Sequence, residues 1–134
     1  MKAAKLLEDS SAERLMPFKG ATQPQATLYD DGAPERLQEW LQNRAVNLSD
    51  ICSWAVHPGG PRILSTCAEA LALDTKLLEE SRVVLQNHGN MSSATILFIL
   101  ERLRQRSVAG PCLALTFGPG LSAEVALLDL QVAE

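Results

Sequence analysis

Residues 51–64 read ICSWAVHPGGPRIL and join a short apolar run to a second run of helical periodicity through a Pro-Gly-Gly turn. The first run, 51–56, holds a tryptophan and two β-branched residues, which is typical of a buried strand. Pro61 suits the first position of a helix. The apolar residues that share one face of this helix are Ile63, Leu64, Cys67 and Leu71. A strand that turns into an amphipathic helix is typical of an α/β domain.

The chain after this helix predicts two more helices and two strands. A helix with Leu78, Ser81 and Val84 on one face is expected to end at Gly89, because glycine suits the left-handed backbone of a helix end. The next helix is apolar almost all round, which indicates burial, and Ser92 and Ser93 are expected to cap it. Strands are predicted at 112–117 and 125–130. We therefore predict the α/β class, with layered helices on a mixed β-sheet.

The chain before the first strand divides into two parts. Apolar residues at i, i+3 and i+4 predict an amphipathic helix over 34–45. Residues 1–33 instead indicate an irregular N-terminal arm, with a short helix over 2–15 and then a passage rich in Pro, Gly and Gln. The prediction is an arm over 1–33 and one folded domain over 34–134.

Composition and charge narrow the class of protein. The chain has 134 residues, of which 46% are hydrophobic, enough for a single core. A formal charge of -4 argues against a nucleic-acid binder, which needs clustered Lys and Arg. The longest apolar run, 96–100, is far shorter than the roughly 18 residues of a membrane span. We therefore expect a cytoplasmic protein that binds neither nucleic acid nor a membrane.

The three cysteines, Cys52, Cys67 and Cys112, form no CxxC pair and have no clustered histidines nearby. Their spacing predicts neither a metal site nor a redox motif. Each lies in an apolar segment, so we expect all three to be small buried residues of the core.

Two polar residues stand where an α/β domain often positions its chemistry. His57 follows the first strand directly, at the end of a sheet where ligands bind, and histidine titrates near neutral pH. Gly59 and Gly60 carry no side chain, so a long thin ligand can approach the backbone there. Asn90 lies between a helix end and a helix start, where its uncharged side-chain amide can be held in place to donate to a ligand.

Each of these residues also has a purely structural interpretation. His57 can be a turn histidine, and Asn90 can be a capping or helix-end residue. A Gly-Pro-Gly loop follows a later strand of the same chain. The three features occur together by chance far less often than any one of them occurs alone.

The chain resembles the C-terminal half of the chalcone and stilbene synthase family, the type III polyketide synthases, over residues 34–130. Three segments carry the resemblance, namely HPGG at 57–60, GNMSS at 89–93 and FGPG at 117–120. The resemblance implies one half of a thiolase-like fold. It also implies an acyltransferase that condenses malonyl-CoA, with loss of carbon dioxide, onto an acyl-thioester starter. No cofactor is implied, because coenzyme A thioesters are the substrates.

The resemblance further implies roles for individual residues. His57 and Asn90 would be the catalytic histidine and asparagine of a Cys-His-Asn site, and both would donate to the thioester oxygen. Ser92 would line the cavity in which the polyketide grows. The remaining substrate-binding positions would be Gly59, Gly60, Gly118, Pro119 and Gly120.

The cysteine of the family lies in an N-terminal half that has no counterpart in this sequence. The chain would then be incomplete as an isolated enzyme. It would bind acyl-CoA and malonyl-CoA together with a complementary N-terminal half that carries the cysteine, or as a homo-oligomer. The alternative is a non-catalytic thiolase-like remnant or an interaction domain. In both cases we expect the apolar helix after Ser93 to expose an apolar patch.

Overall fold

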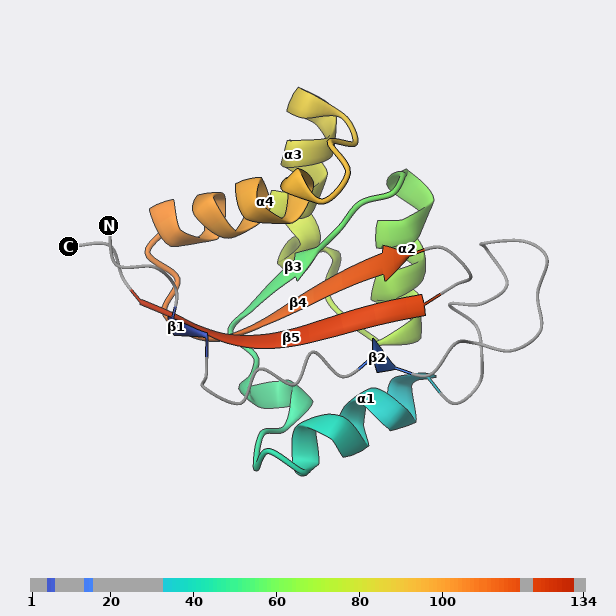
Figure 1. The fold of residues 1–134 in the computed structure, drawn as a ribbon, viewed down its shortest axis with the longest axis vertical. Coiled ribbons are helices and arrows are strands. Elements are labelled where there is room, and N and C mark those ends of the chain that lie inside the picture. The colour runs from blue at the N-terminus through green and yellow to red at the C-terminus, as the bar shows by residue number, and fades with distance from the viewer. Residues whose placement is uncertain (1–4, 7–13, 16–32, 119–121, 132–134) are drawn as a thin grey trace.

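The computed structural model describes residues 5–6, 14–15, 33–118 and 122–131. Its centre is a mixed sheet with the strand order β1-β5-β4-β3, and β2 also pairs with β5. β3 runs parallel to β4, whereas β4 and β5 are antiparallel (Figure 1). The strands are β1 (Lys5–Leu6), β2 (Arg14–Leu15), β3 (Ser53–Val56), β4 (Gly110–Gly118) and β5 (Ser122–Leu130).

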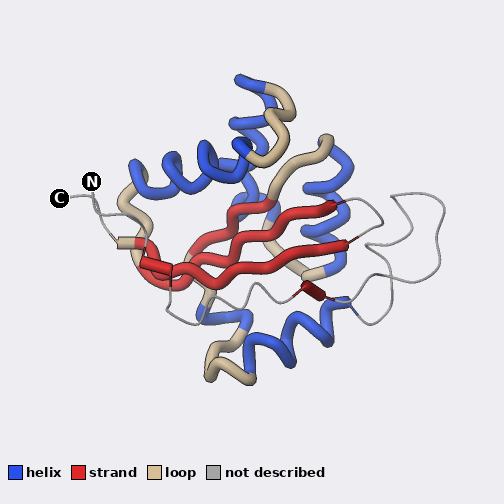
Figure 2. Tube along the Cα trace, viewed as in Figure 1, coloured by secondary structure: helices blue, strands red, loops and turns tan. Residues whose placement is uncertain are grey.

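Helices lie on both faces of this sheet (Figure 2). They are α1 (Ala33–Gln42), α2 (Pro61–Ala70), α3 (Glu79–His88) and α4 (Ala94–Gln105), with short 3-10 turns η1 (Leu48–Asp50) and η2 (Thr75–Leu78). α3 and α4 cover one face, and α1 lies on the other (Figure 1). Side chains of α1 and α2 share one apolar cluster, so the domain has three layers.

The alternation of side chains along the strands builds a separate apolar cluster on each face. In β3, Trp54 and Val56 pack with α1 and α2, whereas Ala55 packs with α3 and α4. β4 alternates in the same way, and it presents Cys112 and Ala114 to α3 and α4. Small residues on this face let the two helices approach the strands closely.

The structure confirms the predicted class and several of its elements. A buried strand precedes His57, Pro61 begins α2, and the predicted strands near the C-terminus are β4 and β5. Gly89 ends α3 with a φ of 68°, as the sequence indicated. The predicted α/β domain with helices layered on a mixed sheet is therefore confirmed.

The short helix predicted over 2–15 is wrong. Within that range the structure has two strands, β1 and β2, and both pair antiparallel with β5. The outer edge of β5 offers backbone groups for pairing, and these contacts outweigh the local preference for a helix. The rest of the arm lies outside the described residues, and the division after residue 33 stays a prediction.

α4 begins differently from the expectation. Ser93 occupies the N-cap position, but its hydroxyl makes no capping hydrogen bond. Thr95, which is fully buried, accepts a hydrogen bond from the backbone N–H of Met91 at 2.9 Å instead. The start of α4 is thus held from inside the domain rather than by the serines.

α4 is also less buried than its composition predicted. Its inner face buries Thr95, Ile99 and Leu103, whereas Leu97 and Phe98 are 64% and 44% exposed. The sheet covers only one side of the helix, so the other side has an apolar surface. These two neighbouring exposed side chains agree with the expected apolar patch, whose extent stays a prediction.

Gly110, at the start of β4, has a backbone that only glycine adopts readily. Its φ is 102°, and an added Cβ would lie 3.0 Å from the sulfur of Cys52. We expect Gly110→Ala to lower the free energy of unfolding by about 1–2 kcal/mol, which urea denaturation would measure.

Gly60→Ala is the matched control for this substitution. Its φ of 176° is ordinary extended backbone, and no heavy atom of the described residues lies within 4 Å of an added Cβ. Equal destabilisation by the two alanines would contradict the account of Gly110.

Candidate functional site

His57 stands at the carboxyl end of β3. Its backbone N–H donates to the carbonyl of Leu115 in β4 at 2.8 Å, and its carbonyl accepts from the N–H of Gly59 at 3.1 Å. Pro58, between these two residues, is fully buried. The side chain of His57 is only partly buried. The backbone is therefore tied to the sheet while the imidazole can still contact a ligand.

Burial lowers the pKa of His57 below its ordinary value of 6.5, because a low-dielectric surrounding disfavours the charged ring. At neutral pH the imidazole is therefore uncharged and has one N–H to donate. The unfolded chain binds this proton more tightly than the folded chain. His57 consequently makes the domain less stable as the pH falls through 6.5 toward the lower pKa of the folded state, and has no such effect well above 6.5.

Asn90 lies in the tight connection between α3 and α4. Its side-chain Oδ1 accepts a hydrogen bond from the backbone N–H of Ser92 at 2.8 Å, and the residue is exposed. Ser92 has a φ of 58°, a left-handed conformation that non-glycine residues rarely adopt. This hydrogen bond holds the side-chain oxygen against the loop backbone, and the amide nitrogen of Asn90 is the group that can donate to a ligand.

The segments that carry His57 and Asn90 border the same apolar cluster, which lies between the sheet and the α3–α4 layer. Ala55, two residues before His57, belongs to the apolar cluster between the sheet and α3 and α4. Met91, the residue after Asn90, packs against that same cluster. The structure thus anchors both predicted catalytic segments in one cluster.

The Gly-Gly pair after His57 leaves the backbone accessible. An added Cβ at Gly59 would make only ordinary contact, 3.6 Å from Ile63, and at Gly60 it would meet no heavy atom of the described residues within 4 Å. Packing within this chain therefore does not require glycine at position 59 or 60. The assignment of these residues, and of Ser92, to substrate binding stays a prediction.

The predicted Gly-Pro-Gly loop is described only in part. Gly118 is the last residue of β4 and pairs with Ser122 of β5. Pro119 and Gly120 lie outside the described residues. Their predicted role in shaping a pocket is untested.

The cysteines do not provide a nucleophile beside His57. Burial raises the pKa of Cys67 to about 12 and also raises the pKa of Cys112, so both stay protonated thiols at neutral pH. Cys52 is exposed, which corrects the expectation that all three are buried, because it precedes the first residue of β3. It therefore lies at the other end of that strand, roughly 16 Å of extended chain from His57.

Two further polar residues of α3 are buried. Ser81 is fully buried and Glu80 is 4% exposed. Ser81 follows the apolar spacing of the helix, so its burial could be predicted from the sequence. The burial of Glu80 could not be predicted from the sequence, because its ion-pair partners, Arg102 and Arg106, lie at the end of α4.

The described residues form neither a metal site nor a membrane-spanning helix. Among the described residues no group of His, Cys, Asp and Glu could hold a metal ion. No helix in the described part of the chain is long and apolar enough to cross a membrane.

The three layers, the mixed sheet and the strand-turn-helix around His57 define one half of a thiolase-like α/β domain. The crystal structure of PKS-I from the brown alga Ectocarpus siliculosus superimposes on 81% of this chain and 30% of that one, with a TM-score of 0.72 and 29% identity.

Sequence comparison identifies the family. The model of the C-terminal domain of chalcone and stilbene synthases matches residues 31–131. The alpha-pyrone synthesis polyketide synthase-like Pks18 of Mycobacterium tuberculosis is 34% identical over 103 residues, 74% of this chain and 26% of that protein. The type III polyketide synthase pspB of Penicillium soppii is 40% identical over 85 residues, 63% of this chain and 21% of that protein.

The chain therefore belongs to the type III polyketide synthase family and represents its C-terminal domain. It spans about a quarter of the length of the mycobacterial relative.

Proposed function

We propose that this domain supplies the histidine and the asparagine of a Cys-His-Asn site that condenses malonyl-CoA with an acyl-thioester starter. The observation that carries the proposal is the uncharged, partly exposed imidazole of His57 at the end of β3, a strand whose Ala55 belongs to the apolar cluster against which Met91 of the Asn90 turn packs. The proposed location is the cytoplasm, and no cofactor is required, because both substrates are coenzyme A thioesters.

The two residues would act as hydrogen-bond donors. When malonyl-CoA loses carbon dioxide, the bond to the carboxylate carbon breaks and its electron pair forms an enolate, with negative charge on the thioester oxygen. The N–H of His57 and the amide of Asn90 would donate to that oxygen. Donors of this kind are each worth about 10²–10³ in rate, because they are already aimed at the charge when it develops.

The enolate carbon would then attack the carbonyl carbon of an acyl group carried by a cysteine. A carbon–carbon bond forms, the carbon–sulfur bond breaks, and the thiolate is released. The described cysteines do not suit this role, so the nucleophile would come from a complementary N-terminal region. Gly59 and Gly60 would let the pantetheine arm pass along the backbone, because an added Cβ at Gly60 would meet no heavy atom of the described residues within 4 Å and one at Gly59 would make only ordinary contact with Ile63.

A second candidate, an interaction domain without catalysis, is favoured by the exposed apolar residues Leu97 and Phe98 of α4. In the catalytic proposal the N-terminal region packs on this face. In the alternative the face binds a partner or a second copy of the chain.

A chimera tests the catalytic proposal. Residues 31–131 replace the matched region of the mycobacterial relative, and release of labelled carbon dioxide from malonyl-CoA is measured. We expect release together with a polyketide product. A folded chimera whose cysteine accepts an acyl group, but which releases no carbon dioxide, would overturn the catalytic proposal and leave the interaction domain.

A further inference from the structure

The backbone just before His57 is held from two sides. β3 is the last strand in the order β1-β5-β4-β3, so β4 borders it on one side only. The N–H of His57 bonds to Leu115 of β4 at 2.8 Å. The preceding N–H, that of Val56, donates to the hydroxyl oxygen of Ser81 in α3 at 3.1 Å. A helix side chain thus takes the place of a neighbouring strand at this residue.

The interior position of this contact makes it structurally important. Val56 and Ser81 are both fully buried. A buried backbone N–H without a partner is costly, and water cannot easily replace a hydroxyl in such a position. Without Ser81, the amide of Val56 would have to reach another acceptor, and the end of β3 would move with it.

Ser81 itself sits on a fixed support. The preceding residue, Glu80, has its carboxylate 2.7 Å from the Nε of Arg102 and 2.7 Å from the Nε of Arg106, both near the end of α4. One turn further along α3, Val84 is fully buried in the cluster that also contains Ala55. α3 is therefore anchored both to α4 and to the sheet, so Ser81 presents its oxygen from a rigid element.

We propose that Ser81 is a positioning residue for His57, and that its hydrogen bond to Val56 sets the place of the imidazole at the end of β3. The contacts around Val56 support this role of Ser81 whether or not the domain is catalytic. Donation from the positioned imidazole to a thioester oxygen rests on the proposed function.

Nuclear magnetic resonance of the histidine rings tests the proposal on the intact chain. The sequence has two histidines, so His88 gives an internal reference signal. In Ser81→Ala we expect the His57 ring signal to shift and its pKa to move up toward 6.5, because the loosened strand end admits water, whereas His88 stays unchanged. The amide of Val56 should exchange its hydrogen about tenfold faster or more.

Two further variants separate positioning from general destabilisation. Ser81→Thr keeps the hydroxyl, so His57 should retain its wild-type signal and pKa in this variant. Thr95→Val removes another fully buried hydroxyl, the acceptor for Met91, and should leave His57 unchanged. If Ser81→Ala does not fold, Ser81→Cys, with its weaker acceptor, replaces it in the same comparison.

The proposal is overturned if a folded Ser81→Ala or Ser81→Cys variant keeps the wild-type pKa and signal of His57, or if Thr95→Val moves them equally. These readouts do not need catalysis. An inactive chimera together with a displaced His57 would remove the proposed function and keep the positioning role. An active chimera, together with an undisturbed His57 signal in Ser81→Ala, would support the proposed function and remove the positioning role of Ser81.

Discussion

Replacing His57 with alanine in the chimera should lower the rate of malonyl-CoA decarboxylation at least about 10²-fold, because the enolate oxygen loses one of its two proposed donors. The uncharged imidazole offers that N–H at neutral pH. The loss should fall on kcat rather than on KM, since the donor contacts charge that develops only in the transition state. Labelled carbon dioxide released per unit time is the measurement.

His88→Ala is the matched control for this experiment. His88 is the other histidine of the chain, and it lies exposed at the end of α3 with its ring 5.2 Å from that of Phe98. We expect this variant to keep the full rate. His57→Gln, which retains an N–H donor, should recover part of the activity. A His57→Ala chimera as fast as the unsubstituted one would show that this residue has no catalytic role.

The second large effect concerns the buried carboxylate of Glu80. Arg102 donates a hydrogen bond to its Oε2, and Arg106 lies in ion-pair contact with its Oε1. Replacing both arginines with alanine leaves this carboxylate buried and without a cation. We expect the free energy of unfolding to fall by about 3 kcal/mol, the lower end for breaking a buried ion pair, because the arginines themselves are partly exposed. Urea denaturation measures the difference.

A third substitution checks the cause of this loss. Adding Glu80→Leu to the double variant removes the uncompensated charge and should restore part of the stability. If the triple variant is less stable than the double variant, the buried carboxylate is not the origin of the effect.

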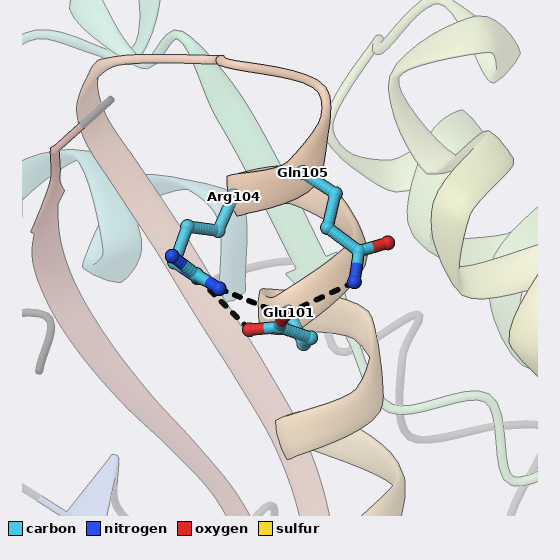
Figure 3. A network of polar contacts seen from close by, with 3 residues as sticks. All are labelled: Glu101, Arg104 and Gln105. Atoms are coloured by element: carbon cyan, nitrogen blue, oxygen red, sulfur yellow. Dashed lines mark hydrogen bonds and ion pairs between the residues drawn. The ribbon is translucent and has the colours of Figure 1, made fainter. Parts of the chain in front are cut away.

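Arg104→Ala is the control for the double arginine variant, because Arg104 is an arginine of the same helix whose ion pair lies at the surface. Arg104 donates two hydrogen bonds of 2.9 Å to Glu101, and Gln105 donates a third of 3.0 Å (Figure 3). The hydrogen bonds from Arg104 and then Gln105 lower the pKa of the Glu101 carboxyl. This network is exposed, so water replaces its contacts readily, and we expect the free energy of unfolding to stay almost unchanged.

The elements around the candidate site could be predicted from the amino-acid sequence alone. The strand before His57, the helix from Pro61 and the end of α3 at Gly89 follow from short-range features. These are β-branched residues in an apolar run, a proline at the first helical position, and a glycine directly after the last residue of a helical pattern. Such features act within a few residues, so they can be recognised without knowledge of the fold.

The contacts through which these elements support one another could not be predicted in this way, because they join residues far apart along the chain. Ser81 bonds to a strand 25 residues away, and Arg102 reaches a carboxylate 22 residues away. The pairing of β1 and β2 with β5 joins segments still further apart along the chain. The sheet also covers only one side of α4, so Leu97 and Phe98 stay exposed although their helix reads as buried. Local propensity contains no information on such partners, because burial and hydrogen bonding depend on what the rest of the fold brings near.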